Sequence, residues 1–195
     1  MPDSSIDARL ACLDRRRSTP ARHLDAPAPD QATLLRMLES AVRVPDHGKR
    51  VPFRFITVQG EARHVLGERL AARSRERDPG LPEAVVDKDR HRFSMAPLVV
   101  TVVAQLGPDE KIPEQERLLS AGSVCFALLQ AAQALDYGAV WLTGWPAYDA
   151  VVGSWLGLQA HEHIIGFIHI GTPTLEAPER ERPDPAALLT DWLPA

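Results

Sequence analysis

Cysteine is scarce in this sequence, with two residues in 195. Two cysteines cannot build the disulfide framework that is typical of small secreted domains. Cys12 and Cys125 each lie within an apolar helical pattern. We therefore expect both thiols to be buried as small hydrophobic side chains in a reducing compartment.

The sequence also lacks a secretion signal and a run that could span a membrane. Its first ten residues, MPDSSIDARL, have neither a basic start nor an apolar stretch. The apolar run 96–106 is too short to cross a bilayer. We therefore expect a cytoplasmic protein without a membrane partner.

An excess of positive charge is absent as well. The formal net charge is −4, which argues against a nucleic-acid partner. Only three lysines accompany 19 arginines. Each guanidinium is a planar fork of donors suited to phosphate or carboxylate groups.

Several motifs that would indicate a particular chemistry are missing. The sequence has no G-x-G-x-x-G after a strand, no G-x-x-x-x-G-K-[ST] and no G-x-S-x-G, so Rossmann, P-loop and nucleophile-elbow sites are not supported. His161 and His163 would share one face of a strand, and with His169 they could bind a metal. Because no cysteine or carboxylate completes a recognised spacing, surface histidines are favoured over a metal hydrolase, which stays as an alternative.

The most informative stretch that is present covers residues 118–144. Small and apolar residues recur there at three- and four-residue spacing and occupy nearly the whole circumference, which predicts a long buried helix. In a chain this short, such a helix usually lies between the protein's own sheet and a second subunit. Gly138 ends the helix, and a strand at 139–142 runs into the turn Thr143-Gly144-Trp145-Pro146.

Strands are predicted at four places, 53–59, 96–106, 139–142 and 163–170, and five or six helices alternate with them. This order is typical of a single three-layer α+β or α/β domain over residues 1–195. The last residues, 172–195, are rich in proline and carry one apolar patch. We expect them to form an extended arm that docks on a second subunit. The patch consists of Leu188, Leu189, Trp192 and Leu193.

Two arginine-rich segments are candidates for holding an anion. Residues 15–17 with Ser18 end the first helix, where they could bind a phosphate or simply form a solvated terminus. The loop 44–53, between a helix and a strand, is polar and bounded by prolines, so it is a functional surface or a solvated loop. Its candidate cations, with the residue before it, are Arg43, His47, Lys49 and Arg50.

Two tryptophans, Trp141 and Trp145, flank the turn 142–144. Backbone N–H groups in this turn would be free, and ring faces would lie near. An apolar wall with a few backbone donors suits a flat aromatic ligand.

The chain carries a series of short motifs in a fixed order. They are Arg16-Arg17-Ser18, Arg43-Val44-Pro45-Asp46-His47, Pro52-Phe53-Arg54-Phe55, Ala96-Pro97-Leu98-Val99-Val100, Ser120-Ala121-Gly122, residues 138–144, Ile165-Gly166-Phe167 and Gly171-Thr172-Pro173. In this order and spacing the chain resembles the FMN-dependent nitroreductase family, particularly its small bacterial NAD(P)H nitroreductases, from about residue 10 to residue 193.

The resemblance implies an α+β nitroreductase-like fold with three layers, α/β/α. Helices would flank a central mixed, mostly antiparallel sheet, with the long buried helix at a dimer interface and an extended C-terminal arm. It further implies a homodimer with two shared, tightly bound FMN groups. NAD(P)H would reduce them, and nitroaromatics, quinones or similar small acceptors would reoxidise them in a ping-pong hydride-transfer cycle. No catalytic side chain and no metal is implied, because the flavin carries the chemistry.

The resemblance also assigns roles to individual residues. One chain would hold the phosphate and the ring edge through its first arginine motif and a late arginine, the other chain would reach the same flavin from its loop, and the turn would line the ring. These residues are, in that order, Arg16, Arg17, Ser18 and Arg182; Arg43 and His47; and Trp141, Leu142 and Thr143.

Three positions depart from the family pattern. Lys49 and Val51 stand where many members carry Asn and Gln, and Leu142 stands where a polar residue is common. These departures keep open a flavin-binding dimer without turnover, such as a sensor or storage module.

Overall fold

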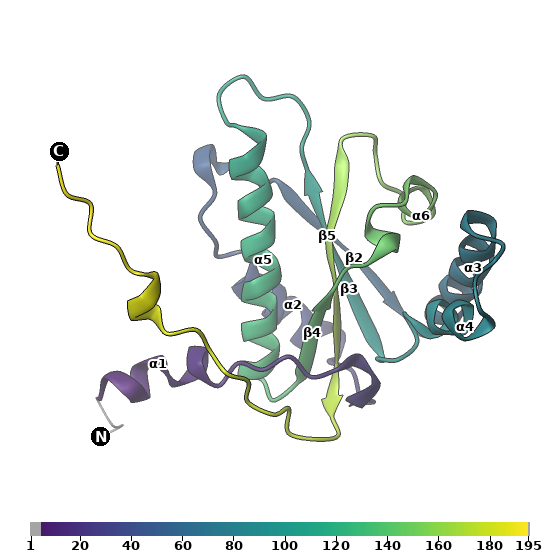
Figure 1. The fold of residues 1–195 in the computed structure, drawn as a ribbon, viewed down its shortest axis with the longest axis horizontal. Helices are drawn as coiled ribbons and strands as arrows, with labels where there is room; N and C mark the ends of the chain where they lie inside the picture. The colour runs from purple at the N-terminus through teal and green to yellow at the C-terminus, as the bar shows by residue number, and fades with distance from the viewer. Residues whose placement is uncertain (1–4, 195) are drawn as a thin grey trace.

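A five-stranded sheet forms the centre of the protein in a computed structural model that describes residues 5–194 (Figure 1). The predicted domain 1–195 extends past these residues at both ends. β5 pairs with β1, β3 and β4, β3 also pairs with β2, and all these pairings are antiparallel. The expected mixed sheet is therefore antiparallel throughout the described residues. The strands are β1 (Leu24–Asp25), β2 (Phe53–Gln59), β3 (Leu98–Gln105), β4 (Gly138–Leu142) and β5 (Glu162–Pro173).

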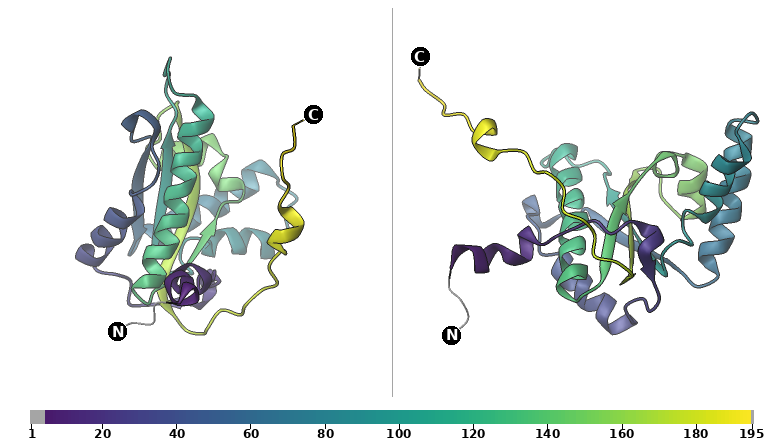
Figure 2. Two further views of the ribbon diagram at one scale, coloured as in Figure 1. Left: turned by 90° about the vertical axis from the view of Figure 1, so that its left-hand side faces the viewer. Right: turned by 60° about the horizontal axis from the view of Figure 1, so that its bottom comes forward.

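Helices cover both faces of the sheet, so the predicted α+β, three-layer arrangement is confirmed. α2 and α5 pack on one face in a large apolar core, whereas α3 and the start of α6 pack on the other around Phe93 and Phe167. α3 and α4 form a hairpin at one side of the sheet (Figure 2). The helices are α1 (Ile6–Asp14), α2 (Gln31–Ala41), α3 (Ala62–Arg77), α4 (Glu83–His91), α5 (Glu114–Ala134) and α6 (Ala150–Trp155).

β3 shows why the apolar run predicted a fully covered strand. Its sequence LVVTVVAQ has no polar alternation, and seven of its eight residues are buried. A strand buried on both faces needs apolar side chains on both.

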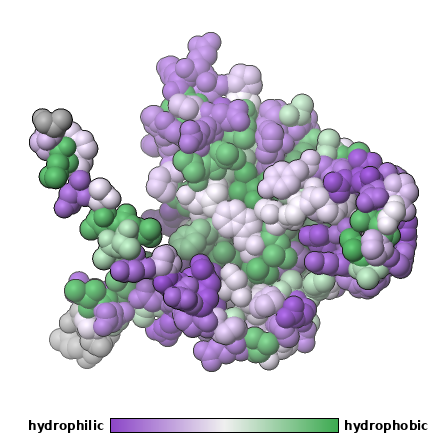
Figure 3. Space-filling model, viewed as in Figure 1, coloured by the Kyte–Doolittle hydropathy of each residue, from purple (hydrophilic) through white to green (hydrophobic). Residues whose placement is uncertain are grey.

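The long helix α5 is buried on one side only. Val124, Cys125 and Leu128 are fully buried against the sheet, but Leu119 is 62% exposed and Phe126 is 48% exposed. Hydrophobic residues therefore remain on the outer surface around α5 (Figure 3). The chain itself buries one face of α5, and burial of the opposite face by a second subunit stays a prediction.

Helix α1 and the C-terminal arm stand away from the body (Figure 2). No residue of α1 is buried, and Cys12 is exposed, so the prediction that Cys12 is buried was wrong. The apolar stripe of α1 is real, but residues 5–194 supply no surface that buries it. On the arm, Leu188 is 71% exposed and Trp192 is 84% exposed. Docking of residues 172–195 on a partner stays a prediction.

The short strand β1 brings the two projecting segments together. Leu24 pairs with Pro173, and the Thr174 N–H donates to the His23 carbonyl at 3.0 Å. Because two residues cannot show alternation, this strand was not predicted. Because β1 pairs with the end of β5, the segment that connects α1 to β1 and the segment that follows β5 lie side by side at this edge of the sheet.

Within residues 5–194, no helix combines the length and apolar character needed to cross a membrane.

Candidate functional site

The end of α1 and the beginning of the arm meet in a cluster of arginines. Arg17 forms an ion pair with Glu179, and the Arg182 guanidinium donates to the same carboxylate at 2.9 and 3.1 Å. Glu179 thus joins two positions that lie at opposite ends of the sequence. A hollow of about 450 Å³ opens between them, lined by Leu13, Asp14, Arg16, Glu179 and Arg182.

The charged form of Arg16 is destabilised by its surroundings in this cluster. Burial lowers its pKa, and the charges of Arg182, Arg17 and Arg180 lower it further. Its Nη1 donates to the Ser18 hydroxyl at 3.3 Å, and its other guanidinium donors find no acceptor among the residues that the structure describes. A cation crowded by like charges is stabilised by an incoming anion. The cluster therefore favours a phosphate or a carboxylate.

Arg17 makes several contacts within its own chain, and its expected contact with the phosphate stays a prediction. Its guanidinium donates to the carbonyls of Asp14 and Arg16 at 2.6 and 3.0 Å, and its backbone N–H donates to Gln133 Oε1 at 2.9 Å. These bonds fix the loop after α1 on the last turn of α5. Arg17 shapes the cluster, whereas Arg16 presents the open donors.

Arg180 is a member of the cluster that sequence reasoning missed. It lies within the run Glu179-Arg180-Glu181-Arg182 of the proline-rich segment, for which the sequence predicted only an extended arm. Nothing local in the sequence marks it, because its role depends on the approach of Arg16.

Arg43 and His47 lie at the other end of α5. His47 Nδ1 is 2.6 Å from Glu116 Oε2 in the first turn of that helix, whereas Arg17 is fixed on Gln133 near the last turn. At 1.5 Å per residue, the helix places these two contacts about 25 Å apart, as Figure 1 shows for the segments concerned. One chain cannot bring His47 and Arg16 to the same small ligand.

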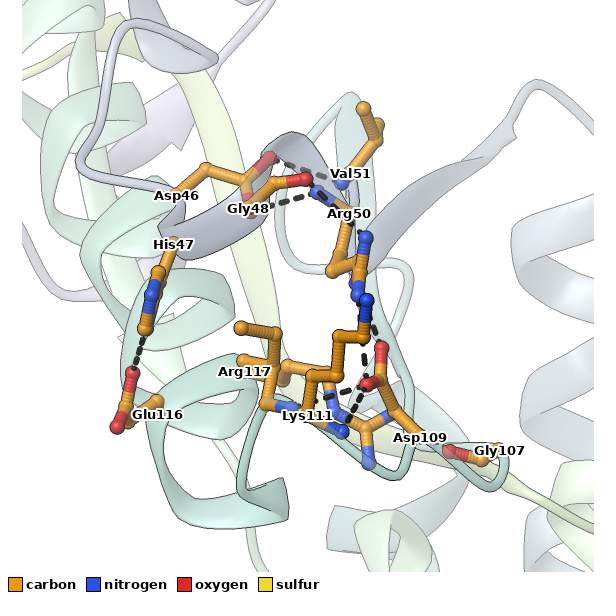
Figure 4. A network of polar contacts seen from close by, with 11 residues as sticks. Asp46, His47, Gly48, Arg50, Val51, Gly107, Asp109, Lys111, Glu116 and Arg117 are labelled. Carbon is orange, nitrogen blue, oxygen red and sulfur yellow. Dashed lines mark hydrogen bonds and ion pairs between the residues drawn. The ribbon is translucent and has the colours of Figure 1, made fainter.

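The loop that carries His47 has a strained backbone. Lys49 and Val51 have φ of 51° and 49°, a left-handed region that is uncommon for any residue except glycine and rarest for a β-branched residue such as Val51. The Asp46 carboxylate accepts the N–H groups of Arg50 and Val51 at 3.0 and 2.8 Å, and Arg50 forms an ion pair with Asp109 at 2.6 Å (Figure 4). Strain that a network of this kind maintains is typical of functional segments.

The third predicted group, around Trp141, lies on β4 beside β5. The Trp141 indole donates from Nε1 to the Ile165 carbonyl at 3.1 Å, and the residue is 36% exposed. A Cβ at Gly166 would lie 2.0 Å from this nitrogen. The ring therefore depends on glycine at 166 to lie against the strand, with one side left open.

The turn after β4 offers unused donors. The backbone N–H groups of Thr143, Gly144 and Trp145 find no acceptor among residues 5–194. Gly144 has a φ of +80°, which glycine tolerates without strain. Three successive free N–H groups beside a partly exposed indole suit the edge of a flat, polar ring.

The three histidines considered for a metal do not gather. His161 and His163 are exposed, whereas His169 is fully buried, so its assignment as a surface histidine was wrong. β5 is the central strand of a sheet covered on both faces, and this position could not be seen in the sequence. Among residues 5–194 no three histidine, cysteine or acidic side chains form a group that could hold a metal ion.

His169 is buried without a hydrogen-bond partner for either ring nitrogen among the described residues. Its ring stacks on Phe93, with centroids 6.2 Å apart. Burial, together with the nearby charge of Arg92, lowers the pKa of His169 to about 4. The imidazole is therefore neutral in the folded protein at neutral pH.

We expect His169 to make the protein acid-sensitive. Because the ordinary pKa is 6.5 and the folded pKa about 4, the unfolded chain binds the extra proton in this window. The free energy of unfolding then falls as the pH drops from 6.5 towards 4, by about 2 kcal/mol at pH 5. Urea unfolding at pH 7.5 and pH 5 should show that His169→Phe removes this part of the pH dependence. His163→Phe, on the same strand but exposed, is the control, and an unchanged slope in His169→Phe would contradict the assignment.

The protein thus combines an α+β fold with a surface cluster of arginines, a partly exposed indole and, among residues 5–194, three backbone N–H groups without an acceptor. The sequence pattern of the Nitroreductase family matches residues 13–172. The chain therefore belongs to the Nitroreductase family, a family of oxidoreductases.

Two relatives cover most of the chain. The Escherichia coli K12 protein named "Putative NAD(P)H nitroreductase YdjA" is 34% identical over 186 residues, which are 93% of this chain and 97% of the relative. A Haemophilus influenzae protein named "Putative NAD(P)H nitroreductase" is 36% identical over 173 residues, 88% of this chain and 91% of the relative.

Solved structures share the fold at lower identity. A nitroreductase-like family protein from Bacillus cereus has a TM-score of 0.80 at 20% identity, covering 98% of both chains. A nitroreductase from Desulfovibrio desulfuricans, described as a complex with FMN, has a TM-score of 0.72 at 24% identity, covering 95% of this chain and 97% of that one.

Proposed function

We propose that this protein is an FMN-dependent NAD(P)H oxidoreductase that works as a homodimer. Nitroaromatics, quinones or similar small acceptors would be its second substrates in a ping-pong cycle. The observation that carries the proposal is the arginine cluster at the surface: Glu179 joins Arg17 to Arg182, and Arg16 lines the same hollow, where the charges of Arg182, Arg17 and Arg180 lower its pKa. The E. coli and H. influenzae relatives bear NAD(P)H nitroreductase names, and the D. desulfuricans neighbour is described as an FMN complex.

The residues present fit FMN. The guanidinium groups of Arg16, Arg180 and Arg182 would hold the dianionic phosphate, for which forked donors are well shaped. Glu179 occupies part of this cluster in the free chain and would give way to the phosphate. Trp141 and Leu142 would form a wall for the ring, and the free N–H groups of residues 143–145 would face its polar edge.

The second half of the site would come from another copy of the chain. His47 contacts Glu116 in the first turn of α5, and the Pro45 carbonyl two residues after Arg43 accepts the Ser120 hydroxyl, whereas Arg17 is fixed on Gln133. The loop with Arg43 and His47 therefore lies about 20 to 25 Å from the arginine cluster of the same chain. The outer face of α5 exposes Leu119 and Phe126, an apolar surface typical of a dimer interface. A homodimer would cover this face and bring the loop of each chain to the flavin of the other.

The chain itself would provide position, shielding and electrostatics. When bound, FMN supplies the redox chemistry, accepting a hydride equivalent from NAD(P)H and delivering it to the acceptor. No side chain of the protein is needed as an acid or base in this scheme. The backbone donors at 143–145 would stabilise the negative charge that the reduced ring carries.

The proposal is tested by the visible spectrum of the purified protein after addition of FMN and gel filtration. We expect a flavin band that stays with the protein and is lost when NADH or NADPH is mixed in without air. Arg16→Ala should raise the dissociation constant of FMN about tenfold to hundredfold, because a charge-assisted hydrogen bond to the phosphate is removed.

The control is Arg9→Ala, which removes an equal charge from the exposed side of α1. A wild-type protein that retains no FMN would contradict the proposal. A protein that retains FMN but stays oxidised with both nicotinamides would instead be a flavin-binding module without turnover.

A further inference from the structure

A buried carboxylate joins three separate segments next to the proposed ring site. Asp89, on α4, is 4% exposed. One of its oxygens accepts the Ser74 hydroxyl at 2.5 Å and the Trp145 indole N–H at 2.9 Å, and the other accepts the Arg92 guanidinium at 2.8 Å. Both oxygens are therefore occupied, and each partner belongs to a different part of the fold.

The charge of Asp89 is stabilised where it lies. Burial raises the pKa of a carboxyl, but here hydrogen bonds from Ser74, Arg92 and Trp145 outweigh it and lower the pKa of Asp89. Removing this acceptor would leave a partly buried indole N–H and a partly buried guanidinium without their partner, which is costly.

The α3–α4 hairpin, residues 62–91, makes further contacts with the same short segment. The Arg77 guanidinium lies 4.3 Å from the centre of the Trp145 ring. Arg73 donates to Asp149 at 3.1 and 3.2 Å, and Asp149 in turn caps α6 by accepting the N–H groups of Val151 and Val152. Residues 145–149 are thus held from one side by the hairpin.

These contacts bear directly on the turn with free donors. Trp145 supplies the last of the three unpaired N–H groups, and Gly144 precedes it. The Arg92 guanidinium lies 3.0 Å from where a Cβ at Gly144 would stand. Whatever fixes Arg92 and Trp145 therefore fixes the direction of the N–H groups of residues 143–145.

We propose that Asp89 is a positioning residue for the flavin, which holds Trp145 and Arg92 so that the turn 143–145 aims its backbone donors at the ring edge. The inference rests on the proposed function. Asp89 acts through the turn and does not touch the ligand. Hydrogen-bond donors at a fixed distance stabilise negative charge better than donors that must reorient.

The test compares Asp89→Asn with Asp87→Asn, the same change two residues away on α4. Asp87 is exposed and pairs with Arg90 outside this network. For each FMN-loaded protein, the dissociation constant of FMN and the midpoint potential of the bound flavin are measured. We expect Asp89→Asn to weaken FMN binding about tenfold and to move the potential to a more negative value, because the loosened donors stabilise the reduced ring less. Asp87→Asn should match the wild type in both.

Trp145→Phe provides a second variant in case Asp89→Asn does not fold. It removes the N–H donor to Asp89 but keeps a ring for Arg77, and we expect a smaller change in the same directions. If Asp89→Asn and Trp145→Phe lower the thermal midpoint but keep the wild-type affinity and potential, Asp89 only supports the fold and the inference is wrong. If the wild type binds no FMN, the failure lies in the proposed function itself.

Discussion

Mixing two defective chains should restore FMN binding. We expect Arg16→Ala and Arg43→Ala each to bind FMN poorly as homodimers, and the hybrid dimer of one chain of each kind to bind one FMN with nearly wild-type affinity. The reason is geometric. His47 and Arg17 are fixed on opposite ends of α5, about 25 Å apart, so each flavin would take its cluster from one chain and its loop from the other.

The hybrid dimer would have two different flavin sites. One of its sites combines the intact Arg16 of one chain with the intact Arg43 of the other, and the second site lacks both arginines. Co-expression with two different affinity tags isolates the hybrid, and the ratio of flavin to protein then gives the number of sites. We expect one FMN for two chains.

A matched hybrid serves as the control. Arg16 and Arg182 belong to the same cluster of one chain, so a hybrid of Arg16→Ala with Arg182→Ala has one defect in each site. This hybrid should not be rescued. Rescue of both hybrids, or of neither, would show that the two halves of the site do not come from different chains.

Replacing Gly67 by alanine should destabilise the protein strongly. In α3, a Cβ at this position would lie 2.0 Å from the backbone carbonyl oxygen of Arg90, at the crossing with α4. Backbone cannot turn away as the end of a side chain can, so the hairpin must open. We expect a loss of about 3 kcal/mol in the free energy of unfolding, in the upper part of the range for overpacking.

The direction of this effect is informative because the same change normally stabilises a helix. Alanine is favoured over glycine in a helix interior by about 1 kcal/mol. Gly153→Ala in α6 is the control, since its Cβ would meet Leu158 at an ordinary 3.7 Å. Denaturant unfolding of both variants should give changes of opposite sign. A Gly67→Ala protein as stable as the wild type would mean that the two helices do not cross this closely.

Local patterns predicted the main elements well. The alternation of Phe53–Gln59 gave β2 with its observed bounds, and the unbroken apolar run gave β3. The spacing of small residues gave α5 to within four residues at its start. In each of these elements the spacing of apolar residues is contained in one short segment and recurs several times along it, so it can be recognised from local sequence.

Properties that depend on distant parts of the chain could not be predicted in the same way. Cys12 lies on an apolar stripe, but its exposure depends on where α1 points. His169 lies in an ordinary-looking strand, but its burial depends on the helices above and below β5. Arg180 and Asp89 gain their roles only from the segments that fold against them. The family resemblance singled out Arg16 and Arg182, and the fold shows how the two come together.

The pairing of β1 with the end of β5 determines when the arginine cluster can form during folding. The arginine cluster joins the beginning of the chain to its last part, so it has the largest sequence separation of any contact considered above. During synthesis, Arg17 can pair with Glu179 only after nearly the whole chain has left the ribosome. Contacts of such high order form late, because the loop between them must first be closed. If the cluster holds the phosphate of FMN as proposed, loading of the cofactor would be a final step of maturation, and a chain that ends before Glu179 would lack part of the cluster.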